Sequence, residues 1–323
     1  MMEILRYPDN LLKIETGQQV KQLRLFDDDG TLKKEYSITI NNSIERVLNL
    51  NEKNENQYAV EFPSEIESKL SEDIKNKICR ELSGTEIRVL TAVLSLAQSA
   101  NDRNELVYME KTHQAYFEFD LSSFYLASGM DKNKHGKFAK KSKDSINTAL
   151  LSLHRKEFLI PYQFMDGKKE VRGISIVPLL QIHAVEQWDD LSNRKKTQLY
   201  KMTVSGIFFN INEKQNSYFN LPVNLNNRLR EINPGRPNVG IELFIKCLYQ
   251  SLHCAKSNTI EYGYNKLVEI MKLEKYKKNN HHKRIKPTIE KAFKTALKLG
   301  IILKFEEAKS KYGGLKYVIT LNK

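Results

Sequence analysis

The clearest pattern in this chain lies in the stretch KKNNHHKRIKPTIEKAFKTALKLGIILKFEEAKSKYGGLKYVIT (residues 277–320). Up to Gly300 an apolar residue recurs at every third or fourth position, which is the period of an amphipathic helix. Pro287 suits the first turn of such a helix, and Gly300 suits its C-terminal cap. Two strand-like runs lie on either side of Gly313-Gly314. The stretch therefore predicts one long helix and then a β-hairpin.

This predicted helix separates its apolar side chains from its basic ones. At 100° per residue, the apolar residues fall within a sector of about 100° and the lysines fall on the opposite side. The apolar side consists of Ile289, Ala292, Phe293 and Ala296, and the basic side consists of Lys291, Lys294 and Lys298. We expect the first side to pack against a core and the second to face a partner.

A similar order of elements occurs earlier in the chain. Ser83 and Glu86 form a capping box that predicts the start of a helix. A strand and a short helix closed by Gly129 follow, then a basic helix over 137–156 and two strands over 158–164 and 174–180. Three helices and a hairpin form the element order of a winged helix, a type of helix-turn-helix.

The same order returns in the last third of the chain. An Asn238-capped helix over 238–253 and a short helix over 264–273 precede the long helix and hairpin described above. An offset of 143 residues places Ile146 on Ile289 and the strand residues 158–160 on 301–303. The pattern predicts an internal structural repeat.

We therefore predict an α+β, mostly helical fold with two tandem winged-helix domains and a poorly defined N-terminal extension. The extension is expected over 1–80, with a hairpin turn near Asp29-Gly30. The other expected ranges are 81–190 for the first winged-helix domain, 191–222 for a linker and strand, and 223–323 for the second winged-helix domain.

The charge of the chain favours a polyanionic partner. The formal net charge is +13 and the pI is near 9.4. Residues 275–316 contain thirteen basic and three acidic residues, and residues 132–156 contain eight basic residues and one acidic residue. Because the rest of the chain is slightly acidic, the excess charge marks two binding surfaces and not a uniformly basic protein.

We expect these two surfaces to bind double-stranded DNA through the third helix of each repeat and the hairpin behind it. Such helices enter the major groove, while basic and small hydroxyl side chains approach phosphates and base edges. The candidate residues of the first repeat are Lys137, Lys140, Lys141, Ser145, Thr148, Arg155, Lys168, Lys169 and Arg172. Those of the second repeat are Lys283, Arg284, Lys286, Lys291, Lys294, Lys298, Lys309, Lys311 and Lys316.

Several other classes of function find no support in the sequence. Walker, GxSxG, HExxH and clustered-carboxylate motifs are absent, so we expect no enzyme activity and no cofactor. His281-His282 lacks further ligands nearby, so we expect no metal site. No apolar run is long enough to span a membrane. Three cysteines without CxxC spacing and the lack of a signal pattern favour a reducing cytoplasm.

The layout resembles plasmid replication initiators built from two tandem winged helices. The resemblance covers residues 82–321 and rests on TEIRVLTAVLSLAQ, DSINTALLSLHRKEFL, FNLPVNLNNRLREINPGRPNVGIELFIKCLYQSLH and TIEKAFKTALKLGIILKF. It implies binding to repeated origin sequences, opening of the adjacent duplex, and recruitment of a host replicative helicase or its loader. It also implies a homodimer that forms through the first winged helix and represses its own gene.

Three other functions remain open from the residues alone. A transcriptional regulator with the same fold would bind one operator without opening DNA. A nicking nuclease would need a metal and would cleave its site. A basic interaction module would bind acidic proteins or membranes without sequence preference.

Overall fold

The computed structural model describes residues 4–16, 35–39, 57–61, 82–109, 114–154, 156–166, 169–190, 195–205, 218–310 and 313–323. Helices and antiparallel strands both contribute to the fold, which is therefore of the mixed class that the sequence predicts. Strands cover nearly as many of the described residues as helices do, so the expectation of a mostly helical protein is not confirmed.

The first half of the described chain forms a unit that we call the first module (84–205). Its first helix, α5, begins where the capping box predicts: Ser83 Oγ accepts from the Glu86 backbone N–H, and the Glu86 carboxylate accepts from the Ser83 N–H. The elements of this module are α5 (Gly84–Asp102), β4 (Val107–Met109), β5 (Gln114–Asp120), α6 (Leu121–Ala127), α7 (Lys140–His154), β6 (Glu157–Asp166), β7 (Lys169–Pro178), β8 (Leu180–Asp190) and β9 (Lys195–Ser205).

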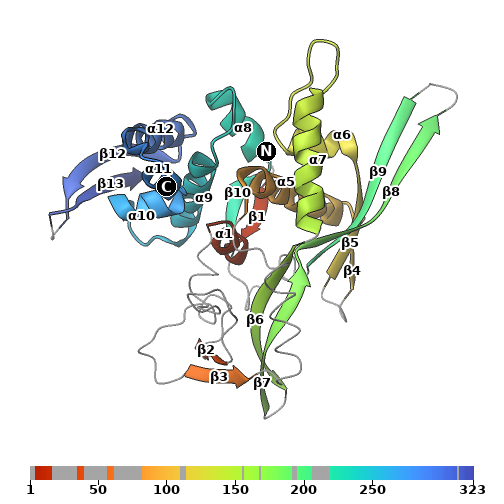
Figure 1. The fold of residues 1–323 in the computed structure, drawn as a ribbon, viewed down its shortest axis with the longest axis horizontal. Helices are drawn as coiled ribbons and strands as arrows, with labels where there is room; N and C mark the ends of the chain where they lie inside the picture. Colours follow the sequence, from red (N-terminus) through yellow and green to blue (C-terminus); the bar gives the residue numbers. More distant parts are fainter. Residues whose placement is uncertain are drawn as a thin grey trace.

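The strands of the first module form two separate sheets. One is a four-stranded antiparallel sheet in the order β4-β5-β9-β8, and the other consists of β6 and β7 alone. In Figure 1 the β6–β7 ribbon runs toward the lower edge of the molecule, whereas β8 and β9 run toward the upper right. The range 191–222, predicted as a linker and strand, therefore contains β9, which is the central partner of β5 and β8.

A second module (239–321) fills the last part of the chain. Its elements are α9 (Val239–Cys254), β11 (Thr259–Gly263), α10 (Tyr264–Ile270), α11 (Glu274–Lys278), the 3-10 helix η2 (His282–Arg284), α12 (Ile285–Lys298), β12 (Ile302–Lys309) and β13 (Leu315–Leu321). Asn238 caps α9 by accepting from the backbone N–H groups of Gly240 and Ile241. Gly240 lies so close to the turn after α10 that an added Cβ would come within 2.5 Å of the Met271 carbonyl oxygen.

The two modules share the order of their main strands. In each, the strand before the second helix (β5 or β11) pairs with the last strand (β9 or β13), which also pairs with the strand preceding it (β8 or β12). The described strands therefore do not support the predicted alignment of 158–160 with 301–303, because among them β6 pairs with β7 and not with the last strand of its module. The counterpart of β12 is β8. The β6–β7 ribbon is an additional element that follows α7 and precedes β8 along the chain.

Part of the N-terminal extension belongs to the body of the protein. Strand β1 (Ile4–Pro8) pairs with β10 (Tyr218–Pro222), and helix α1 (Asp9–Thr16) contacts α9. Strands β2 (Glu35–Thr39) and β3 (Gln57–Glu61) pair with each other. The predicted turn near Asp29-Gly30 lies outside the described residues.

One hydrophobic core joins the two modules and the N-terminal segment. It contains buried residues from β1, α1, α5, α7, α9, α12 and β13. A short helix, α8 (Leu225–Ile232), connects the modules and lies between α12 and the α6–α7 part of the first module in Figure 1.

Candidate nucleic-acid interface

Helix α12 has the two-sided character that its sequence predicts. Ile289, Ala292, Phe293 and Ala296 are all fully buried, and Phe293 stacks on Phe305 with ring centroids 4.5 Å apart. Lys291, Lys294 and Lys298 are exposed. Gly300 follows the helix with a positive φ of 72°, a conformation that favours glycine and ends the helix. The helix thus presents a fixed row of three cations.

Helix α7 presents a different mixture of side chains. Its inner side buries Ile146, Ala149, Leu150 and Leu153. The candidates on its outer side, all exposed, are Lys140, Lys141, Ser145 and Thr148. Lys137 is exposed in the preceding loop, where the Asn133 side-chain oxygen accepts from the backbone N–H groups of His135 and Lys137. Hydroxyl and ammonium groups together can donate to phosphates and to base edges.

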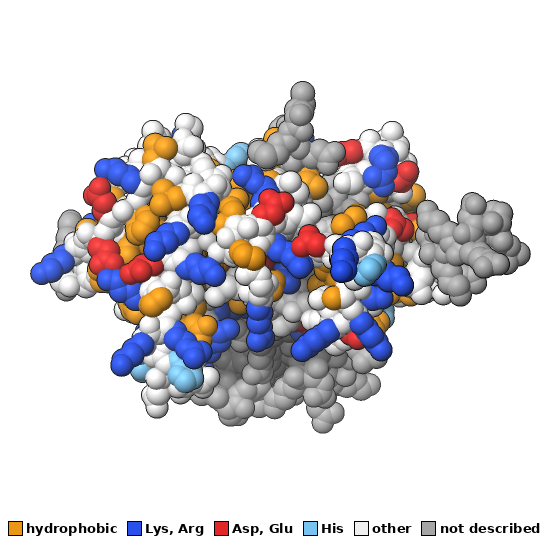
Figure 2. Space-filling view, turned by 90° about the horizontal axis from the view of Figure 1, so that it is seen from above, with side chains coloured by type: hydrophobic (Ala, Val, Ile, Leu, Met, Phe, Trp, Pro, Cys, Tyr) orange, Lys and Arg blue, Asp and Glu red, His pale blue; other side chains and the backbone are white. Residues whose placement is uncertain are grey.

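Both helices contribute to the upper side of the molecule as drawn in Figure 1. The N-terminal end of α7 points upward there, and α8 and α12 lie at the same level. Figure 2 shows this side face-on: Lys and Arg side chains are spread across its width, with Asp and Glu side chains between them. The face is therefore rich in cations without being a single uninterrupted patch.

Ion pairs separate the candidate lysines into two groups. Lys286 Nζ lies 2.8 Å from a carboxylate oxygen of Glu307, and Lys316 Nζ lies 2.8 Å from one of Glu261. The hydrogen bond and charge of Glu307 raise the pKa of Lys286. Among the described residues, no carboxylate is within ion-pair distance of the remaining candidate lysines and arginines whose side chains are placed; these are Lys137, Lys140, Lys141, Lys169, Lys283, Arg284, Lys291, Lys294, Lys298 and Lys309. The second group has charge that an anionic partner could neutralise.

The candidates in the predicted wings are less well placed. Lys169 and Arg172 lie in β7, on the ribbon that runs away from the upper face in Figure 1. The hairpin of the first module that takes part in the main sheet is β8–β9, whereas the sequence prediction placed the wing at 158–164 and 174–180, which lie in β6 and β7. Lys309 is exposed at the end of β12. Arg155, Lys168 and Lys311 lie outside the described residues.

The remaining reactive groups are few in the described part of the chain. His281 and His282 are exposed just before α12, and no group of three or more His, Cys, Asp or Glu side chains there could hold a metal ion. Burial raises the pKa of the Cys247 thiol to about 12, so this cysteine is protonated at neutral pH and is a poor nucleophile.

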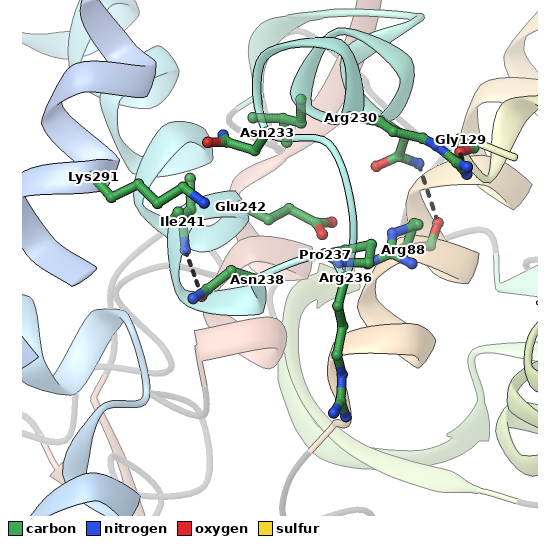
Figure 3. A pocket seen from close by; sticks show the side chains of 12 residues that line it. Arg88, Gly129, Arg230, Asn233, Arg236, Pro237, Asn238, Ile241, Glu242 and Lys291 are labelled. Carbon is green, nitrogen blue, oxygen red and sulfur yellow. Dashed lines mark hydrogen bonds between the residues drawn. The ribbon is translucent and has the colours of Figure 1, made fainter. Parts of the chain in front are cut away.

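The structure also brings together basic residues that the sequence prediction missed. A cleft between the two modules has in its wall Arg88 of α5, Arg230 of α8, Arg236 of the α8–α9 connection and Lys291 of α12. In Figure 3 Arg88, Arg230 and Lys291 lie around the cleft with Glu242 between Lys291 and the two arginines, and Arg236 extends away from them. Of the four basic residues, only Lys291 was a sequence candidate. The signal that could have found two others is the pair Arg230 and Arg236 between the predicted domains.

Helix α8 fixes this cleft by contacting both modules. The Asn226 side-chain amide donates to the Ala127 carbonyl at the end of α6, and Arg230 donates to the Gly129 carbonyl and pairs with Asp131 at 2.8 Å. On the other side, the Asn233 amide donates to Thr295 Oγ1 of α12 at 2.9 Å. The α8 region therefore sets the distance between α12 and the loop that leads into α7.

Comparisons with known proteins give no family: no family model matches the chain, and no curated protein matches it. Among the described residues, no helix combines the length and apolar character needed to cross a bilayer.

Proposed function

We propose that this protein binds double-stranded DNA sequence-specifically through two tandem winged-helix domains. In this proposal α7 and α12 are the two recognition helices, each entering the major groove with its exposed side. The strands β8–β9 and β12–β13 are the two wings. The domain boundaries move accordingly, with the first domain extending to the end of β9 at Ser205.

The observation that carries the proposal is the matching of the two modules. Both have the strand order in which the last strand is central, and both place an amphipathic helix before the wing. The outer sides of these helices hold cations with no carboxylate partner in the described chain, such as Lys141 and Lys294. A protein that needed these lysines only for solubility would have no reason to repeat the arrangement.

We further propose that the bound sites are repeats in a plasmid origin and that binding initiates replication. This part rests on the resemblance of residues 82–321 to tandem winged-helix initiators. The partners would be the origin duplex, a host replicative helicase or its loader, and a second copy of the chain. The protein would act in the cytoplasm without enzymatic activity, cofactor or metal.

Selection from a random duplex library tests the first part of this proposal. We expect the protein to enrich one motif, and we expect binding to the selected duplex to weaken steeply as salt rises, because phosphate contacts release counterions. A scrambled duplex of the same composition is the control. Equal affinity for both duplexes at every salt concentration would refute sequence-specific recognition.

A plasmid maintenance assay tests the second part. A plasmid that carries repeats of the selected motif beside an A·T-rich segment should replicate only when the gene is supplied in trans. Permanganate probing should then detect unpaired thymines in that segment. Binding and repression without maintenance or duplex opening would identify a transcriptional regulator and refute initiation.

A further inference from the structure

The cleft between the modules is built from elements that are distant in sequence. Arg88 comes from the first helix of the first module, Arg236 from the connection between modules, and Lys291 from α12. In Figure 3 Lys291 reaches into the cleft from one side, while Arg88 and Arg230 lie on the other. Folding therefore gathers positive charge at a position where sequence gives no continuous basic run.

Most of this positive charge is not neutralised within the described chain. Arg230 is paired with Asp131, but Arg88, Arg236 and Lys291 have no carboxylate within ion-pair distance among the described residues. Glu242 is also in the wall and subtracts one charge from these three, while its Oε1 lies 3.6 Å from Lys246 Nζ, which is paired more closely with Glu15. The cleft thus retains an excess of cations that an anion would stabilise.

The helix dipole of α9 adds to this field. The N-cap Asn238 and the first-turn residue Ile241 line the cleft, so the positive end of a 16-residue helix opens onto it. Arginine side chains present a planar fork of N–H donors that matches two phosphate oxygens, which makes a phosphate group the anion of best fit.

The position of the cleft indicates where such a phosphate would come from. Lys291 belongs to the exposed row of α12, and Gly129 in the opposite wall immediately precedes the loop that leads into α7. A duplex that contacts both α7 and α12 must cross the gap between them.

We propose that this cleft binds a phosphate of the DNA backbone between the two DNA segments that α7 and α12 contact, which we call the half-sites. Arg88 and Arg236 would donate to the phosphate oxygens, and Lys291 would add charge from the α12 side. This inference rests on the proposed function, and it adds a contact that carries no base information but fixes the register of the two modules on the duplex.

The test uses the full chain and the duplex obtained from the random library. Three variants are compared with the wild type: Arg236→Gln, the double variant Arg88→Gln with Arg236→Gln, and the control Lys256→Gln. Arg236 is exposed, so its replacement leaves the core intact even if the double variant folds poorly. Lys256 is an equally exposed base beyond the far end of α9, about 24 Å along the helix from the cleft.

The first measurement is the salt dependence of binding. The slope of log K against log salt should fall in magnitude by about 1 for Arg236→Gln and by about 2 for the double variant, because each lost phosphate contact removes nearly one unit. The control should keep the wild-type slope. In the second measurement, neutral methylphosphonates replace the phosphates between the half-sites, which should weaken wild-type binding at least tenfold and the double variant much less.

Each outcome has a distinct meaning. The proposal is supported if methylphosphonates between the half-sites weaken binding by the wild type at least tenfold and binding by the double variant much less. If the wild type binds the duplex but ignores central methylphosphonates, the proposal is wrong although DNA binding stands. If inorganic phosphate raises the melting temperature of the wild type, and not of Arg236→Gln, while the central phosphates have no effect, the cleft takes free phosphate and the DNA contact is refuted. If the wild type selects no duplex at all, the proposed function fails as well.

Discussion

Lys246 of α9 and Glu15 of α1 form an ion pair in which neither side chain is exposed to solvent, with Nζ 2.8 Å from Oε2. Lys246 also donates to Tyr7 Oη of β1 at 3.0 Å and to Thr91 Oγ1 of α5 at 2.8 Å. The Tyr7 hydroxyl in turn donates to Glu15. Burial raises the pKa of Glu15, and the charge of Lys246 acts against that shift. This network ties the N-terminal segment to both modules.

Removing one partner of the pair should destabilise the whole protein. We expect Lys246→Met to lower the free energy of unfolding by about 3–5 kcal/mol, because it leaves the buried Glu15 carboxylate uncompensated. Urea unfolding of the wild type and the variant at pH 7 measures this change. Adding Glu15→Gln to Lys246→Met should recover at least about 1 kcal/mol, since contacting residues couple by about 0.5–3 kcal/mol. A cost below about 1 kcal/mol for Lys246→Met would show that the network does not hold the modules together.

The pair of Glu86 and Lys156 should make stability depend on acid pH. Burial by itself raises the pKa of Glu86, but hydrogen bonds from Lys156 (Nζ to Oε1, 2.5 Å), the Ser83 backbone and Ser152 outweigh it and lower the pKa. Because the pKa of Glu86 is lowered in the folded protein, its hydrogen bonds stabilise the protein fully above the unfolded pKa of about 4.3. This stabilisation is lost as the pH falls through the pKa of Glu86 in the folded protein.

Glu86→Gln should therefore destabilise the protein at pH 7 by about 1.5–3 kcal/mol, the range for a hydrogen bond to a charged group. The difference from the wild type should shrink below pH 4, which urea unfolding across pH 3 to 7 would detect. Glu105→Gln is the matched control, because Glu105 pairs with Arg103 at the surface, where ion pairs contribute about 0.2–1 kcal/mol. An unchanged difference between Glu86→Gln and the wild type at all pH values would contradict the linkage.

Lysines without carboxylate partners should matter more for DNA binding than paired ones. Lys294→Gln with Lys298→Gln should lower the salt slope of binding by about 2, since each lysine is free to neutralise a phosphate. Lys286→Gln with Lys316→Gln removes the same charge but should lower the slope by less, because the carboxylates of Glu307 and Glu261 already engage those lysines. Fluorescence anisotropy with the selected duplex measures both slopes. Equal losses in the two double variants would show that the ion pairs are irrelevant to the interface.

The two hairpins of the first module should differ in their effect on DNA. Lys195 and Lys196 open β9 of the β8–β9 hairpin, which lies in the main sheet, whereas Lys169 opens β7 of the separate β6–β7 ribbon. Lys195→Gln with Lys196→Gln should weaken binding to the selected duplex several-fold. Lys168→Gln with Lys169→Gln should leave it unchanged, which parallel gel-shift titrations would establish. The opposite result would identify β6–β7 as the wing.

Local features were predictable because they depend on neighbours in the sequence. The Ser83–Glu86 capping box lies within one helical turn, so its two hydrogen bonds follow from four residues. The alternation of Ile289 and Phe293 with Lys291 and Lys294 likewise fixes which side of α12 is buried. For the same reason the row of exposed lysines on α12 was found correctly.

Strand pairing was not predictable from the same kind of pattern. The runs 158–164 and 174–180 do pair with each other, but an apolar alternation does not specify which further strand lies beside them. The main sheet instead joins β5 to β9, which are about 80 residues apart, and this choice depends on packing across the module. The sequence therefore did not predict that β9, within the range 191–222, lies between β5 and β8.

Local sequence patterns predicted α5, α7, α9 and α12, the caps of α5, α9 and α12, and the basic character of α7 and α12, because these follow from the 3.6-residue period and from side-chain chemistry. Two features became visible only in the fold: Lys246 meets Glu15, 231 positions away, and Arg88, Arg236 and Lys291 line one cleft. Such contacts arise from burying apolar surface shared by both modules, and that is a property of the whole chain and not of any short segment.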